Sequence, residues 1–210
     1  MTGVQTCALP ILFLGSAAFC LVAAAAWGAD APLSAAYITP DDVQKVVQAN
    51  GGNAQENSIR MVDMDQNIQM STSLLHRGST EGARPPAAAA APRAPRTPCG
   101  EAAAPAGAKI TNVNMLSHDD ISEIYIITKG TATMVTGGTI FAGAHQTDSK
   151  TIGPTCGGKV YGDVETRELK VGDIVEVPQG VPHGFAKIPG DLEYYNFRLD
   201  PKHVLPPIKN

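Results

Sequence analysis

The sequence lacks the features of a nucleic-acid-binding protein and of a mainly helical protein. Its 16 basic and 20 acidic residues give a net charge of −4, and no basic cluster is present to neutralise phosphates. Aromatic residues make up only 5% of the chain, which contains 21 glycines and 16 prolines. Short strands separated by many turns produce this balance, and long helices do not. We therefore expect a mainly β protein with no nucleic-acid partner.

Several signatures of catalysis are also absent from the sequence. It contains no nucleophile elbow, no glycine-rich phosphate-binding loop and no Cys/His nucleophile pair. No internal repeat is evident, and 210 residues are enough for one domain with a sizeable core. These observations argue against serine-hydrolase, nucleotide-phosphate and thiol-protease chemistry.

Charge is missing altogether from the first 29 residues, which contain no Lys, Arg, Asp or Glu. The apolar run Ile11–Ala26, followed by Gly28 and Ala29, resembles the hydrophobic region and cleavage zone of a secretory signal peptide without its charged start. Residues 1–11 resemble a translated sequencing adapter, which would account for that missing start. We expect residues 12–29 to be a signal peptide and the protein to be periplasmic or secreted. A native uncharged leader and a membrane anchor are the alternatives.

Export to an oxidising compartment would favour disulfide formation among the cysteines of the chain. Cys7 and Cys20 lie in the leader region, which leaves Cys99 and Cys156 in the body of the chain. An even pair in an oxidising compartment predicts one disulfide, here between two loops that contain glycine and proline. Two free thiols are the alternative.

The hydrophobic pattern predicts one short helix followed by many strands. Thr39 and Pro40 indicate a helix start, and Asn50 followed by two glycines indicates its end. Residues 57–75 alternate with a period of two and predict two strands joined near Asp65. Further strands are expected at 109–116, 122–128, 131–136, 164–170, 173–177, 183–188 and 192–199, with a glycine-rich loop at about 142–158. This order predicts an antiparallel sandwich or barrel.

Residues 82–108 are rich in proline and alanine and lack apolar side chains that could pack. They are expected to form a mobile low-complexity loop inserted between strands, in which only Cys99 is held. We expect the barrel to span residues 57–203, after an N-terminal segment at 30–56 that carries the helix. Residues 204–210 are expected to form a tail.

Two short patterns carry the clearest chemistry. The first is His118-Asp-Asp-Ile-Ser-Glu123, and the second ends in Val-Pro-His183. Glycine and proline complete the patterns at Gly130, Gly172, Pro178 and Gly180. A closed β-barrel could bring both imidazoles and the carboxylate to one point, and such a set leaves open positions on a metal ion for substrate or oxygen. The sequence therefore predicts a small-molecule metal site.

Together the two patterns resemble the paired motifs of the cupin superfamily. The resemblance covers roughly residues 57–200 and implies an all-β, double-stranded β-helix or jelly-roll barrel. It implies metal ligation by His118, Glu123 and His183, a set that suits Fe, Mn, Ni, Co or Zn. Leu116 stands where the family has a first histidine, so one of its four usual ligands is missing.

Other residues near the motifs follow from the same resemblance. Lys187 replaces the family's asparagine, and Asp119 or Asp120 is a candidate substitute for the missing ligand. Because side chains alternate along a strand, Tyr125 shares a face with Glu123, and Phe185 shares one with His183. Tyr125 and Phe185 are therefore candidate substrate-binding residues, with core packing as the alternative.

The resemblance to cupins permits three functions, because the superfamily hosts many activities on one barrel. The first is an exported enzyme that uses a divalent metal, such as an oxygenase or isomerase. The second is a non-catalytic module that binds a sugar or organic acid, with a metal-free site in which the two histidines hydrogen-bond Glu123. The third is a structural barrel that forms a homodimer. The expected partner is a small-molecule ligand, with no membrane contact after signal removal.

Overall fold

A computed structural model describes residues 34–52, 54–64, 67–81, 96–147 and 149–208, all of which belong to the compact unit Leu33–Asn210. The predictions for the adapter-like segment, the signal peptide and residues 82–95 fall outside these residues. The elements in chain order are α1 (Pro40–Ala49), β1 (Glu56–Asp63), β2 (Gln69–Arg77), β3 (Pro98–Cys99), β4 (Ile110–His118), β5 (Ser122–Lys129), β6 (Thr131–Gln146), β7 (Thr155–Lys170), β8 (Ile174–Val177), β9 (His183–Lys187) and β10 (Leu192–Asp200). None of the helical segments in the described ranges is long and apolar enough to span a membrane.

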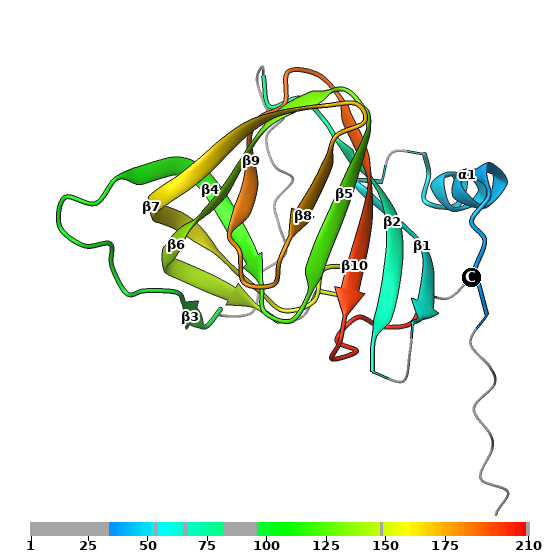
Figure 1. Ribbon diagram of the computed structural model, residues 1–210, viewed down its shortest axis with the longest axis horizontal. Coiled ribbons are helices and arrows are strands. Elements are labelled where there is room, and N and C mark those ends of the chain that lie inside the picture. The colour runs from blue at the N-terminus through cyan, green and yellow to red at the C-terminus, as the bar shows by residue number, and fades with distance from the viewer. Residues whose placement is uncertain (1–33, 53, 65–66, 82–95, 148, 209–210) are drawn as a thin grey trace, which may run out of the picture. The chain divides into compact units, whose positions relative to one another are not determined.

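The strands form two five-stranded sheets around a common interior (Figure 1). One sheet has the order β1-β2-β10-β5-β8 and the other has the order β3-β6-β7-β4-β9, with β6 also pairing with β9. The pairs between these strands are antiparallel. This arrangement is a double-stranded β-helix, or jelly roll, and it confirms the predicted fold class.

The interior changes from apolar to polar along the strands of the first sheet. On β10, every second residue is buried, from Leu192 and Tyr194 to Asn196 and Arg198. The apolar end of this row packs with neighbours such as Ile127 in the largest core cluster. Because the side-chain period of a strand is two, one strand can supply both the core and a buried polar region. The candidate site lies in that polar region.

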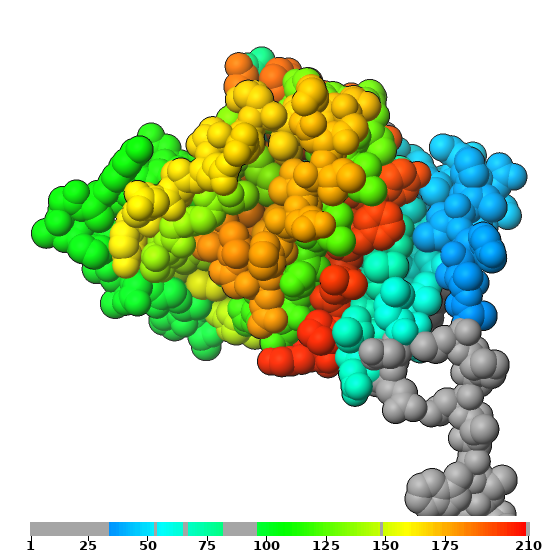
Figure 2. All heavy atoms as spheres, in the orientation of Figure 1, coloured from blue at the N-terminus to red at the C-terminus, as the bar shows by residue number. Residues whose placement is uncertain are grey.

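The predicted helix is confirmed as α1 and packs outside the barrel. Thr39 caps it, with its side chain accepting from the Asp42 backbone N–H at 3.2 Å and the Asp42 carboxylate accepting from the Thr39 N–H at 2.9 Å. Val43 packs against Ile59 of β1 and Leu74 of β2 in a separate apolar cluster. Figure 2 shows this helix beside the first two strands. The helix therefore covers the outer face of the sheet.

The predicted glycine-rich loop at 142–158 is wrong at both ends, because β6 extends to Gln146 and β7 begins at Thr155 in one long bulged hairpin. The β6–β7 register shifts around Gly137 and again between Phe141 and Ala144. A Cβ added to Gly158 would meet the Gly143 Cα at 2.9 Å. These glycines therefore permit bulges and close strand contact, which are structural uses of glycine that resemble a loop in sequence.

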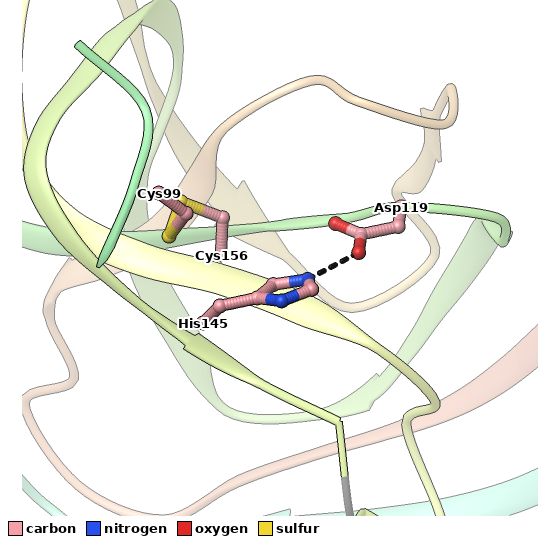
Figure 3. The surroundings of a disulfide bond; sticks show 4 residues. All are labelled: Cys99, Asp119, His145 and Cys156. Atoms are coloured by element: carbon pink, nitrogen blue, oxygen red, sulfur yellow. Dashed lines mark hydrogen bonds and ion pairs between the residues drawn. A yellow bond between two sulfur atoms is a disulfide. The ribbon is translucent and has the colours of Figure 1, made fainter. Parts of the chain in front are cut away.

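Of the predicted insertion, the structure describes residues 96–108, and this part is attached to the barrel. Strand β3 pairs with β6, and Cys99 forms a disulfide with Cys156 of β7, with the two Cα atoms 5.9 Å apart (Figure 3). The predicted disulfide is therefore present in the structure. It joins the end of the proline- and alanine-rich tract to the second sheet.

Gly130 joins β5 to β6 in a backbone conformation that residues other than glycine would not readily adopt. Its φ of +79° lies in the left-handed region, and an added Cβ would lie 2.0 Å from the Asp191 carbonyl oxygen. Both facts explain why the first motif ends in glycine. The tight turn fixes the end of the strand that carries Glu123.

Candidate metal centre

The structure brings His118, Glu123 and His183 together at one buried point. One ligand atom from each lies within 4.8 Å of the other two. The Glu123 Oε2 atom is 3.1 Å from His118 Nε2 and 3.2 Å from His183 Nε2. The three residues are between 2% and 5% exposed, so the centre lies inside the barrel.

Neighbouring strands place these side chains. Glu123 lies on β5, where every second residue from Glu123 to Ile127 is buried. His118 ends β4, and His183 begins β9. The backbone N–H of Gly180 donates to the His118 carbonyl oxygen at 2.9 Å. The turn of the second motif is therefore bonded directly to the first motif.

The second nitrogen of each imidazole is held by a backbone carbonyl. His118 Nδ1 lies 2.8 Å from the Ile152 oxygen, and His183 Nδ1 lies 3.0 Å from the Val181 oxygen. Because a carbonyl oxygen can only accept, both Nδ1 atoms carry the hydrogen, and a neutral ring then presents the Nε2 lone pair. Both Nε2 atoms face the Glu123 carboxylate. Metal-binding histidines are commonly oriented by such a backbone contact.

The two Nε2–Oε2 distances are compatible with a shared divalent cation, and they also equal the length of ordinary hydrogen bonds. Two ligands bound at about 2.1 Å and at right angles are separated by about 3.0 Å. The observed Nε2–Oε2 separations of 3.1 and 3.2 Å are close to that value. Three ligands on one face of an ion leave further coordination positions free. The group can therefore hold a divalent metal, although these atoms do not specify which one.

Glu123 is an ionised carboxylate whose two oxygens have different surroundings. Burial raises its pKa, but hydrogen bonds from His118 and His183 and the charge of Arg198 outweigh burial and hold the pKa well below its usual range. Oε2 accepts from the Tyr125 hydroxyl at 2.6 Å. Oε1 accepts from Asn196 Nδ2 at 2.7 Å and from Arg198 Nε at 2.8 Å. Oε1 is thus occupied by protein donors, and Oε2 faces the imidazoles.

The two residues predicted to contact substrate have different surroundings. Burial and the nearby Glu123 charge raise the pKa of Tyr125 well above its usual value, so its hydroxyl stays protonated and donates to Glu123. Phe185 is partly exposed and lies 5.9 Å from the ring of Tyr194. Tyr125 therefore belongs to the polar centre and Phe185 to the edge of the core. Contact with a ligand stays a prediction for both.

The candidate substitutes for the missing ligand are engaged elsewhere. Asp119 is bonded to His145, beside the disulfide (Figure 3). Asp120 pairs with Lys202 at 2.6 Å. Neither aspartate belongs to the group that could hold a metal. Lys187, which stands where the cupin motif would have asparagine by resemblance, is about half exposed and pairs with Glu81 at 2.8 Å.

Leu116 lies where a fourth ligand could be restored. It is the direct cross-strand partner of His183 and shares a face with His118, two residues further along β4. We expect Leu116→His to raise the metal affinity about tenfold or more, because a new ligand worth about 1.4 kcal/mol changes the dissociation constant by that factor. Titration of metal-free protein with Zn²⁺ measures this. Leu116→Gln is the matched control, and equal affinities in the two variants would contradict the prediction.

Sequence reasoning missed the residues that surround Glu123. The strand pattern over 192–199 predicts only a strand at Asn196 and Arg198, although two polar residues on the same strand face are a visible signal. Nearby, three interior polar atoms have no hydrogen-bond partner among the described residues: Ser71 Oγ, Ser73 Oγ and Asn196 Oδ1. Ser73 is the cross-strand partner of Asn196. The polar interior therefore extends from the centre across β10 to β2.

Comparisons with known proteins show only distant likeness. No protein-family profile matches the sequence, and no curated protein matches it. The solved structure of KdgF from Halomonas sp. is 15% identical, with a TM-score of 0.31 over 71% of this chain and 81% of that one. Fe(II) HppE is 13% identical, with a TM-score of 0.31 over 68% of this chain and 49% of HppE. A cupin-like protein from Thermotoga maritima is 16% identical, with a TM-score of 0.27 over 70% of each chain.

At such low identities and scores these likenesses carry no functional argument, and the iron in the HppE structure is a property of HppE. The functional reasoning for this chain therefore depends on its own residues.

Proposed function

We propose that this protein is a cupin-type barrel that binds one divalent metal ion through His118, Glu123 and His183. The observation that carries the proposal is the orientation of the two imidazoles. Each donates its Nδ1 hydrogen to a backbone carbonyl, so both Nε2 atoms point at the Glu123 carboxylate, and a neutral ring would offer its Nε2 lone pair to a metal ion there. With neutral rings, these three acceptors around one buried point would repel each other unless a metal ion lay between them, whereas protonated rings would hydrogen-bond the carboxylate instead.

The polar interior supports a small organic ligand beside the metal. Ser71, Ser73 and Asn196 are at most 3% exposed and each contributes an unpaired polar atom. Buried polar groups are normally hydrogen-bonded, so unpaired ones at a candidate site favour a ligand or water there. Two hydroxyls and an amide oxygen would complement a hydroxyl-bearing compound such as a sugar or hydroxy acid.

An exported metal-dependent oxygenase or isomerase is the catalytic form of this proposal. A bound metal would supply Lewis-acid polarisation of a ligand oxygen or a position for dioxygen. The chain's own residues would hold the centre in place: Tyr125, Asn196 and Arg198 fix the Glu123 carboxylate. The barrel walls would exclude water from it, since all three ligands are buried.

A non-catalytic ligand-binding module is the second candidate, and one observation favours it. Tyr125 is the titratable hydroxyl bonded to the centre, and it is held protonated by burial and by its donation to Glu123. A group held in this way is poorly suited to exchange protons with a substrate near neutral pH. The described residues at the centre thus offer ligands and fixed dipoles more readily than a general base.

The test is metal binding by the wild-type protein, with the chain starting at Asp30. We expect chelator-treated protein to take up about one Zn²⁺, Co²⁺, Mn²⁺ or Fe²⁺ per chain, as one three-residue ligand set with open coordination positions implies. Isothermal titration and elemental mass spectrometry measure the stoichiometry. Failure to bind any of these ions would defeat the proposal and leave a barrel whose protonated histidines hydrogen-bond Glu123. If the metal does bind, dioxygen uptake under air in the presence of a hydroxy acid would distinguish an oxygenase from a binding module.

A further inference from the structure

The geometry assigns Arg198 a positioning role toward two of the three proposed metal ligands at once. This inference rests on the proposed metal site and adds a residue that lies outside both sequence motifs. Arg198 belongs to β10, which lies between β2 and β5 in the first sheet (Figure 1). Its side chain is 2% exposed, which is exceptional for arginine unless it is fully paired. Its partners therefore identify what it does.

The first partner is Glu123 itself. Arg198 Nε donates to Glu123 Oε1 at 2.8 Å, and Asn196 Nδ2 donates to the same oxygen at 2.7 Å. These two donors occupy Oε1 and leave Oε2 directed at the imidazoles. Arg198 thereby favours a carboxylate that binds through one oxygen only. Charge-assisted bonds of this kind are among the stronger hydrogen bonds in proteins.

The second partner leads to His118. Arg198 Nη1 donates to the Thr151 carbonyl oxygen at 2.8 Å. The next residue, Ile152, provides the carbonyl oxygen that lies 2.8 Å from His118 Nδ1. The guanidinium therefore holds the short segment between β6 and β7 that sets the orientation of the His118 ring. Arg198 therefore contacts Glu123 directly and, through the backbone at Thr151, helps to orient His118.

The third partner, Glu56 of β1, balances the charge. Its carboxylate pairs with Arg198 Nη1 and is 15% exposed. With neutral imidazoles, the two carboxylates and one guanidinium sum to a charge of −1, by the arithmetic −1 −1 +1. Glu56 thus offsets the positive charge of Arg198 beside the cation site. The remaining negative charge of this group still attracts a divalent ion. The neighbouring carboxylates of Glu56 and Glu123 also raise the pKa of Arg198 despite the opposing effect of burial.

Arg198→Lys tests the role because lysine keeps the charge and loses the planar fork. One ammonium nitrogen cannot take the place both of Nε, which bonds Glu123, and of Nη1, which bonds Thr151 and Glu56. We expect Zn²⁺ affinity to fall by about 10- to 100-fold, the usual effect of losing a residue that orients a metal ligand. We also expect the visible absorption of the Co²⁺-loaded protein to change, because Oε1 then keeps only the Asn196 donor and the Glu123 carboxylate can rotate toward binding through both oxygens. A residue that served stability alone would leave that spectrum unchanged.

Arg77→Lys is the matched control. Arg77 lies on β2 of the same sheet, is partly buried, and donates from Nε to the Tyr194 hydroxyl at 3.4 Å, with no contact to the three ligands. We expect it to bind Zn²⁺ with wild-type affinity and to show the wild-type Co²⁺ spectrum. A loss of affinity in Arg77→Lys equal to that in Arg198→Lys would assign both losses to general destabilisation and overturn the inference.

A second variant keeps the inference testable if Arg198→Lys does not fold. Glu56→Gln removes the negative charge that pairs with the guanidinium, keeps an acceptor oxygen, and leaves the three ligands in place. We expect a smaller fall in Zn²⁺ affinity and a shifted Co²⁺ spectrum, and an unchanged affinity and spectrum in the folded variants would overturn the inference. Wild-type protein is titrated in parallel. No binding by wild type would reject the metal site itself, whereas normal wild-type binding with unaffected variants would reject only the role of Arg198.

Discussion

His183→Ala is expected to abolish stoichiometric metal binding. The variant keeps His118 and Glu123 but leaves only two ligands, and a site with fewer than three protein ligands rarely retains a divalent ion against solvent. His183 is 5% exposed, so its truncation leaves a buried cavity at the third ligand position, where a water molecule would be a weaker ligand than the imidazole. Loss of the ring also removes one of the hydrogen bonds that lower the pKa of Glu123.

Elemental mass spectrometry after metal reconstitution measures the effect. The expected content falls from about one ion per chain in wild type to near zero in the variant. His203→Ala is the control, because His203 is exposed and belongs to no ligand group among the described residues. Wild-type metal content in folded His183→Ala protein would show that the ion binds elsewhere.

Reduction of the disulfide is expected to lower the free energy of unfolding by about 4 kcal/mol, from the entropy released when an open chain replaces the closed loop. Cys99 and Cys156 are separated by 57 residues in sequence, so the bond restricts a large part of the unfolded chain. The loop spans β4, β5 and β6, and therefore includes two of the proposed ligands. Its removal affects the unfolded state more than the folded barrel, whose sheet pairing remains.

Urea unfolding with and without dithiothreitol measures the loss as a lower midpoint. The Cys99→Ser, Cys156→Ser double variant is the control, because it should unfold at a low midpoint that no longer responds to reductant. Identical midpoints for oxidised and reduced wild-type protein would contradict the prediction. A change in the slope of the transition would instead indicate that reduction alters the compactness of the unfolded chain.

Much of the local structure could be predicted because it depends on neighbouring residues. Thr39 and Pro40 indicate a helix start wherever they occur in this context, and the observed α1 begins at Pro40. Alternation over residues 57–75 indicated two strands, which the structure has as β1 and β2. The same reasoning failed for the glycines near 142–158. Glycine provides the same backbone freedom in a loop and in a β-bulge. Only the presence of a paired strand distinguishes the two.

The sequence by itself determined the chemical types at the centre: two imidazoles and one carboxylate, with a leucine at the fourth position. It also determined which side chains share a strand face, because a period of two is local geometry. The predicted Cys99–Cys156 pair followed from cysteine count and the expected compartment, and the structure contains it.

Only the tertiary structure decided how those groups are oriented. Arg198 reaches Glu123 across 75 positions of sequence and Glu56 across 142. The carbonyl of Ile152 sets the His118 ring from a segment 34 residues away. Such contacts depend on sheet order and register, which a local pattern does not encode. The two motifs therefore determine which ligand types are present. The folded barrel determines how the two imidazoles are oriented toward Glu123, and this orientation makes the group a candidate metal centre.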